Sequence, residues 1–374
     1  MPNPFEKLLK WNPRTVFAKK RVLGIDIGAS AIKVIELEKD GGGRALLKNY
    51  GELALGPYSP EGVVGQATNL SLEKISQALQ DVFHETGIIP HAGAIAFPIG
   101  PSFLLVIELP NADRRQVETM IPFEARKYIP VPAAEVQLGW QIIPEKSSAL
   151  AAANAPDQKE KKIEVLLAAV HNDTIAKYKE IAKRVGLENA SYEIEVFSAI
   201  RSVIGRDTSP LMILDMGAAT TKLAMVEWGI IHSSHIINMG SQDITNALST
   251  GLSIPKGEAE QAKRDYGLAG MPNDPHFAEA ITLPLGQIFS DASRVLSNYE
   301  RRYNKKTSKV ILTGGGVMLK GLLEFAQKNF DTDVVMGNPF ERVETPAFME
   351  TTLKDAGPEF AVAIGLGLKA LQEG

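Results

Sequence analysis

The spacing of apolar and polar residues predicts a chain that alternates short strands with amphipathic helices. Two strands joined by a tight turn are predicted over 22–37, and a further strand over 45–55. Apolar residues at helical spacing predict a helix over 72–86 that Gly87 ends, and the closing apolar run predicts a helix over 360–371. Strands that alternate with helices are typical of the α/β class.

One short motif occurs twice and divides the chain into two similar halves. The segments 23–37 and 214–227 each consist of an apolar strand, the pattern Asp-x-Gly-Ala-x-x-x-Lys and a second apolar strand. The short interval between Asp and Gly favours a β-hairpin over a loop that leads into a helix. A single motif of this kind also fits an ordinary hairpin turn, whereas its repetition indicates a duplicated domain.

The residues of these turns are suited to binding the phosphates of a nucleotide. Glycine lets backbone amides approach an anion closely, hydroxyl groups donate hydrogen bonds, and lysine supplies positive charge. An aspartate at each strand end can hold Mg²⁺ through water. The sequence therefore predicts a Mg²⁺–nucleotide site between two facing hairpins, with Asp26 and Asp215 as metal ligands. The predicted phosphate-binding residues are Gly28, Ala29, Ser30, Lys33, Gly217, Ala218, Thr220 and Thr221.

A triple glycine near the C-terminus adds a third candidate segment. The buried strand predicted at 310–313 ends in Gly314, Gly315 and Gly316, and a helix over 317–330 is predicted directly after it. Glycines before a helix N-terminus expose free amides and the positive end of the helix dipole to a ligand. We therefore expect these glycines to complete the nucleotide site.

The elements between the two hairpins predict an insertion and a linker. Strands and helices over 45–143 follow the order β-α-β-β-α-β of a compact α+β unit. The Ala- and Lys-rich run 144–162 is typical of a solvated linker, and the strand predicted at 163–170 is assigned to the first main domain. The expected organisation is a leader at 1–20, domain I at 21–44 and 160–207, the insertion at 45–143, a linker at 144–159, and domain II at 208–374 with a helical subdomain at about 241–305.

Composition excludes several function classes. A net charge of −4 argues against a general nucleic-acid binder. The absence of cysteine excludes disulfides and thiolate metal sites, and the six histidines are scattered. With neither a signal-peptide core nor an apolar run long enough to span a membrane, we expect a cytoplasmic location. The amphipathic segment 5–11 suits either a membrane or partner contact, or a frayed terminus.

The two hairpins and the triple glycine resemble the phosphate-1, phosphate-2 and adenosine segments of the actin, sugar-kinase and chaperone ATPase superfamily. The resemblance implies an actin-like ATPase fold, with two duplicated α/β domains around a nucleotide cleft and an inserted α+β domain like that of FtsA. It implies that Glu260 and Lys263 contact ribose and adenine, although their spacing also suits a solvated ion pair. It also makes Glu195 and Asp215 the candidate catalytic residues, but Val196 stands where the family usually has proline.

Within this superfamily the chain is similar to the PilM family of type IV pilus proteins over nearly everything after about residue 20. The residues that carry the similarity are 24–33, 239–245 with the candidate nucleotide contact Gly240, 259–263 and 360–371. The resemblance implies an ATP-binding scaffold of type IV pilus assembly, or of the related type II secretion apparatus, that holds the cytoplasmic N-terminal segment of a PilN-like inner-membrane protein. Pilus motor ATPases are a further expected partner, and the membrane would be reached only through the partner.

Two other function classes stay open. An FtsA-like division or filament protein would carry an amphipathic membrane helix at its C-terminus, whereas 368–374 continues a core helix. A sugar-kinase-type phosphotransferase would need an aspartate base beside the γ-phosphate, and no aspartate of the first domain outside the hairpin suits that role. Whether ATP is hydrolysed stays undecided, and at most a slow ATPase is expected.

Overall fold

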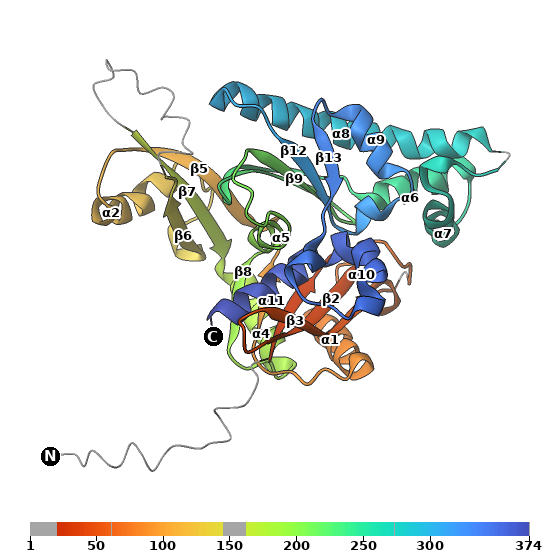
Figure 1. The fold of residues 1–374 in the computed structure, drawn as a ribbon, viewed down its shortest axis with the longest axis horizontal. Helices are drawn as coiled ribbons and strands as arrows, with labels where there is room; N and C mark the ends of the chain where they lie inside the picture. The colour runs from red at the N-terminus through yellow and green to blue at the C-terminus, as the bar shows by residue number, and fades with distance from the viewer. Residues whose placement is uncertain (1–20, 61, 145–161, 273, 374) are drawn as a thin grey trace, which may run out of the picture.

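The structure is a computed structural model that describes residues 21–60, 62–144, 162–272 and 274–373. These residues form two five-stranded sheets and one three-stranded sheet, arranged as in Figure 1. The predicted leader at 1–20 and all but the first residue of the predicted linker at 144–159 lie outside the described residues.

The first sheet begins with the predicted hairpin and has helices on both faces. Its strands, in spatial order, are β3 (Ala45–Ala54), β2 (Ala31–Lys39), β1 (Arg21–Ile27), β4 (Gly93–Phe97) and β8 (Ala190–Ile194). The first three strands are antiparallel and the last two pair in parallel. Apolar residues on one face pack against α1 (Leu72–Thr86) and α4 (Asn172–Arg184), and those on the other face against α5 (Glu195–Val203) and α11 (Ala361–Glu373).

The second sheet repeats this topology, which confirms the predicted duplication. Its strands, in spatial order, are β11 (Ile230–Ile237), β10 (Thr221–Glu227), β9 (Leu211–Met216), β12 (Lys309–Thr313) and β13 (Asp333–Met336). The register pairs Asp26 with Lys33 in the first hairpin and Asp215 with Lys222 in the second. Each hairpin thus presents its aspartate and lysine as cross-strand neighbours on one face.

Four helices accompany the second sheet. They are α6 (Ser241–Leu252), α7 (Lys256–Tyr266), α8 (Pro275–Tyr303) and α9 (Leu322–Asn329). The long helix α8 begins at Pro275, because Asp274 caps its first turn by accepting a hydrogen bond from the amide of His276. Its buried stripe packs against β10 and β11, as expected for a core helix. The face of the second sheet that α8 does not cover shares one hydrophobic core with α5 and the first sheet.

The three-stranded sheet differs from the predicted insertion. It consists of β5 (Ser102–Pro110), β7 (Lys162–His171) and β6 (Val136–Ile142), all antiparallel, with α2 (Arg114–Ala125) packed against it. The predicted start at 45 is too early, because β3, α1 and β4 belong to the first sheet. The assignment of 163–170 to the first main domain is also wrong. Because β7 is buried on both faces, its apolar run does not reveal which sheet it joins.

Two further differences concern the C-terminal part of the chain. Helix α11 packs on the first sheet, although it lies within the predicted range of domain II, 208–374. The helix predicted over 317–330 is interrupted: a 3₁₀ turn at Gly315–Met318 includes the last two glycines of the triple glycine, and α9 begins only after Gly321, which has a φ of 79°. No helix of the described part of the chain is long and apolar enough to cross a membrane.

Candidate nucleotide-binding site

A cavity of about 500 Å³ lies where the two hairpin turns, the triple glycine and α7 meet. The predicted site residues that line it are Asp26, Gly28, Ala29, Ser30, Lys33, Glu195, Asp215, Gly217, Ala218, Thr220, Glu260, Lys263, Gly314, Gly315 and Gly316. Thr221 and Gly240 are not among the lining residues. The Thr221 hydroxyl is buried and donates to the carbonyl oxygen of Met239 at 2.9 Å. Gly240 lies directly behind the β9–β10 turn, where a Cβ atom would collide with the carbonyl oxygen of Ala218.

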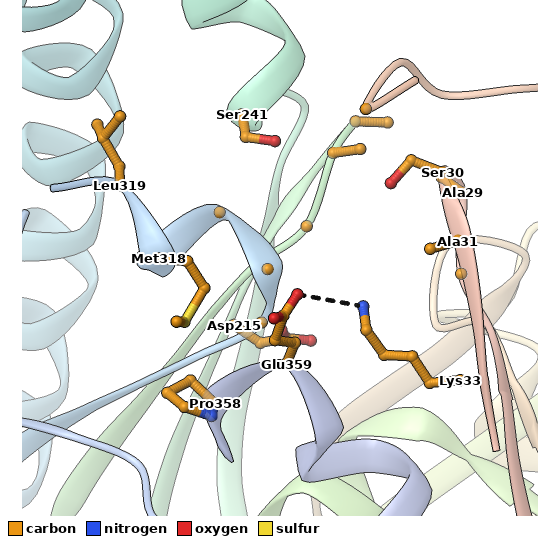
Figure 2. A pocket seen from close by; sticks show the side chains of 18 of the residues that line it. Ala29, Ser30, Ala31, Lys33, Asp215, Ser241, Met318, Leu319, Pro358 and Glu359 are labelled. Carbon is orange, nitrogen blue, oxygen red and sulfur yellow. Dashed lines mark ion pairs between the residues drawn. The ribbon is translucent and has the colours of Figure 1, made fainter. Parts of the chain in front are cut away.

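The first hairpin contributes a buried lysine to the cavity. Figure 2 shows Lys33 reaching toward Glu359, with Ser30 on the same side and Ser241 of α6 facing them. The Lys33 Nζ atom lies 3.4 Å from an oxygen of Glu52 and 3.9 Å from an oxygen of Glu359. Although burial opposes it, these carboxylates raise the pKa of Lys33. The lysine is therefore a fixed positive charge in the wall of the cavity.

Sequence reasoning missed both acidic partners of Lys33. Glu52 comes from β3, and Glu359 from the 3₁₀ turn at Gly357–Phe360 that precedes α11. Neither glutamate belongs to a phosphate-binding motif. The pairing of β2 with β3 places Lys33 directly across from Glu52. Pairing the predicted strands in this register would have revealed Glu52 as a cross-strand partner of Lys33.

The second hairpin lysine organises the acidic floor of the cavity. The Lys222 Nζ atom lies 2.7 Å from an oxygen of Glu195 and 3.4 Å from an oxygen of Asp215. The other oxygen of Glu195 accepts a hydrogen bond from the amide of Ile99 at 2.9 Å. Burial disfavours the charge of Lys222, but Asp215 and Glu195 outweigh it and raise the pKa of Lys222. Glu195 is thus held in place on both sides at the first turn of α5.

Asp26 lies half-buried beside this cluster, and its pKa is strongly shifted. Burial raises the pKa of Asp26 from 3.8 to about 7, and the negative charges of Glu195 and Asp215 add to this effect. Lys33 and Lys222 act in the opposite direction without compensating fully. When Asp26 is ionised, the carboxylates of Asp26, Asp215 and Glu195 face only two lysines, Lys33 and Lys222, and a bound cation would offset the remaining negative charge.

The donor set fits a hydrated Mg²⁺ ion. Among the residues that the structure describes, no three His, Cys, Asp or Glu side chains gather into a metal cage. Mg²⁺ does not require one, because it keeps several waters and is usually bound by one or two carboxylates together with phosphate oxygens. Asp26 and Asp215 provide two such carboxylates at the ends of neighbouring hairpin strands.

The triple glycine brings the backbone against these carboxylates. Gly314 has a φ of 88°, and a Cβ atom at this position would collide with an oxygen of Asp215. Its amide donates to the carbonyl oxygen of Pro358 at 2.8 Å, which ties the turn to the segment before α11. Only glycine suits both the positive φ and the close approach.

Glu260 and Lys263 form a buried cluster at the other end of the cavity, so the interpretation as a solvated surface pair is wrong. Glu260 is 5% and Lys263 is 6% exposed, and their charged atoms lie 2.6 Å apart. The same Glu260 oxygen accepts from the hydroxyl of Thr245 at 2.6 Å, and its second oxygen accepts from Arg264 at 2.8 Å. Burial opposes ionisation, but Lys263, Thr245 and Arg264 lower the pKa of Glu260. The site therefore keeps an ionised carboxylate here.

The start of α6 is bonded to the second hairpin turn. The amides of Ser241 and Gln242 donate to the carbonyl oxygens of Gly217 and Ala218, both at 2.9 Å. These bonds fix the turn against the helix. The arrangement of lysines, hydroxyls and turn amides can bind an anion next to a cation, while Glu195 is already engaged by Lys222 and a backbone amide.

A family comparison decides which of the superfamily resemblances applies. The sequence profile described as "Type IV pilus assembly protein PilM" matches residues 24–371, nearly the whole chain. The chain belongs to the PilM family. This confirms the resemblance found in the sequence and favours a pilus protein over a division protein or a sugar kinase.

Curated relatives of this PilM family member include cell division proteins FtsA. FtsA of Neisseria meningitidis is 29% identical over 196 residues, which cover 44% of this chain and 47% of the relative. FtsA of Pseudomonas aeruginosa is 24% identical over 239 residues, or 57% of this chain and 55% of the relative. The chain thus spans about half the length of the curated relatives it matches.

Solved structures confirm the actin-like ATPase fold. A PilM–PilN type IV pilus biogenesis complex aligns with a TM-score of 0.76 at 23% identity, covering 94% of this chain and 98% of that one. MreB5 of Spiroplasma citri bound to ADP aligns with a TM-score of 0.51 at 12% identity, covering 95% and 99% of the two chains.

Proposed function

We propose that this PilM family member is an ATP-binding scaffold of type IV pilus assembly that binds the cytoplasmic N-terminal segment of a PilN-like inner-membrane protein. The observation that carries the nucleotide part is the cavity between two symmetric Asp–Lys hairpins. It is supported by the actin-like fold, one solved example of which has ADP bound. We place the protein in the cytoplasm, at the inner membrane only through its partner.

The phosphates of ATP would lie between the hairpin turns. The turn amides, the hydroxyls of Ser30 and Thr220 and the charge of Lys33 would hold them. Asp26 and Asp215 would hold a hydrated Mg²⁺, which when bound neutralises phosphate charge. The cluster around Glu260 would bind the nucleoside, because it combines an ionised carboxylate with a buried ammonium group.

The proposed site favours binding over turnover. Positioning an attacking water requires a carboxylate or amide that is free to accept its proton or hydrogen bond. Glu195 is one of the two candidate catalytic residues that the family resemblance implies, and both of its oxygens already accept hydrogen bonds. We therefore expect slow hydrolysis at most.

The three-stranded sheet is the proposed binding module for the PilN-like segment. Strand β6 lies at its edge, so an added strand could pair with it. Beside the sheet, α2 exposes Phe123, and Tyr128 follows just after the helix. The solved PilM–PilN complex with the same fold supports a PilN-like partner.

Calorimetry with a synthetic peptide of the PilN-like N-terminal segment tests this proposal. Phe123→Ala should weaken peptide binding at least tenfold, because exposed aromatic anchors dominate many interfaces. Leu283→Ala is the matched control, since Leu283 is a similarly exposed apolar residue on α8, remote from this sheet. Wild-type affinity in the Phe123 variant would contradict this binding surface, and no binding by the wild-type protein would contradict the partner.

A further inference from the structure

Residues 62–68, here called the strap, connect the two halves of the cavity. The strap lies between β3 and α1, and both of these elements belong to the first half of the fold. The amide of Thr68 donates to the carbonyl oxygen of Ala29 in the first hairpin turn at 2.9 Å. One residue earlier, the amide of Ala67 donates to the side-chain oxygen of Gln242 in α6 at 3.1 Å. A single short segment is thus bonded to both sides of the cleft.

The strap also packs on the residue proposed to read the nucleoside. Gly65 has a φ of 81°, and a Cβ atom on it would collide with the carboxylate of Glu260. The backbone of the strap therefore lies directly against this carboxylate. Val64 and Gly65 both line the cavity, and Val64 is 43% exposed. The strap thus forms part of the cavity wall beside Glu260, at the proposed nucleoside end.

We propose that the strap is a gate at the nucleoside end of the cavity, and that the Ala67–Gln242 hydrogen bond is its latch. This inference rests on the proposed nucleotide function. The strap is part of the first half of the fold and reaches the second half through the contacts of Gly65 and Ala67. Opening of the cleft must break these contacts, so they slow the release of a bound nucleotide.

The geometry explains why position 65 carries glycine and why a substitution of Gln242, rather than of Gly65, can test the gate. A side chain at position 65 would displace either the strap or Glu260, and would disturb the ligand site itself. Gln242→Ala removes the side-chain oxygen that accepts the hydrogen bond from the Ala67 amide of the strap. It leaves in place the backbone amide of residue 242, which donates to the carbonyl oxygen of Ala218. The loss of one such bond corresponds to about a three- to tenfold faster opening.

The test uses the full chain and a fluorescent ATP analogue with Mg²⁺. After equilibrium binding to the wild-type protein is established, excess unlabelled ATP is added and the release of the analogue is followed by stopped flow. Gln242→Ala should release it about three- to tenfold faster. Gln261→Ala is the matched control, because Gln261 is an exposed helical glutamine that bonds Asp265 of its own helix, and it should release the analogue at the wild-type rate.

A second measurement needs no nucleotide. Amide hydrogen exchange of the peptide 62–70 should be faster in Gln242→Ala than in the wild-type protein, and unchanged in Gln261→Ala. No binding of the analogue by the wild-type protein would overturn the nucleotide function and the gate together. Binding with unchanged release in Gln242→Ala, or unchanged exchange in the strap, would overturn the gate alone.

Discussion

The half-buried carboxyl group of Asp26 predicts a variant that is more stable than the wild-type protein but binds Mg²⁺–ATP poorly. In the protein without nucleotide, burial raises the pKa of Asp26 from 3.8 to about 7. Asp26→Asn replaces this carboxyl group by a neutral group of nearly the same shape. We therefore expect the variant to be more stable than the wild-type protein at alkaline pH, although it should bind Mg²⁺–ATP poorly.

The size and sign of the effect follow from linkage between protonation and folding. Because the folded state binds the proton more tightly than the unfolded state, this group favours folding at low pH. Its contribution to the free energy of unfolding is lost as the pH rises from about 4 to about 7. Above that range the wild-type protein is destabilised by the full cost of keeping Asp26 ionised in the folded state. A pKa difference between 3.8 and about 7 corresponds to about 4 kcal/mol at most.

Urea unfolding of the nucleotide-free protein at pH 5, 7 and 8.5 measures the effect. The advantage of Asp26→Asn over the wild-type protein should be small at pH 5 and should grow to a few kcal/mol at pH 8.5. Asp333→Asn is the control for the loss of one negative charge, because Asp333 lies exposed on β13. Equal stability of Asp26→Asn and wild-type protein at pH 8.5 would refute the reasoning that buried charge is in excess at this site.

Three further predictions concern other parts of the site. Lys222→Met should lower the free energy of unfolding by about 3 to 5 kcal/mol, because it leaves Glu195 and Asp215 without their ammonium partner, and Glu195→Gln in the same chain should recover part of this loss. Urea unfolding measures both variants, and an unchanged unfolding midpoint for Lys222→Met would contradict the ion pair. Thr245→Val removes the hydroxyl that donates to Glu260 and should weaken Mg²⁺–ATP binding several-fold, whereas the control Thr119→Val on α2 should leave the affinity unchanged. Equal affinities of the two variants in calorimetry would show that Glu260 does not take part in nucleotide binding. Bound Mg²⁺–ATP should tighten binding of the PilN-like peptide by a factor of about 5 to 150, and the peptide should tighten ATP binding by the same factor, because coupling between two sites is reciprocal. Identical peptide affinity with and without ATP would contradict this coupling and would mean that the protein is a static scaffold.

The parts of the site that the sequence predicts are formed by residues that lie close together in the chain. The repeated motif predicts both the hairpin and its register, because Asp and Lys are close in sequence and the turn between them is short. The triple glycine lies where expected because a strand that ends in glycines leaves room for a close backbone approach. Such signals need no knowledge of distant contacts.

The parts that the sequence did not predict depend on contacts between distant segments. Lys222 bonds to Glu195 from another domain, and Lys33 meets Glu359 near the opposite end of the chain. Apolar periodicity shows that β7 and α11 are buried, but it does not identify the sheet against which each one packs. For the same reason the sequence does not reveal the borders of the insertion, which begins at β5 and ends with β7.

Calorimetric titration of Mg²⁺–ATP into the wild-type protein and into Asp215→Ala tests the nucleotide site most directly. Asp215 lines the cavity, lies next to Lys222 and is the second proposed Mg²⁺ ligand. We predict one bound nucleotide per wild-type chain, and affinity at least tenfold lower in Asp215→Ala, since charge-assisted contacts are strong. Absence of binding by the wild-type protein, or the same affinity in Asp215→Ala, would contradict an ATP-binding site between the two hairpins.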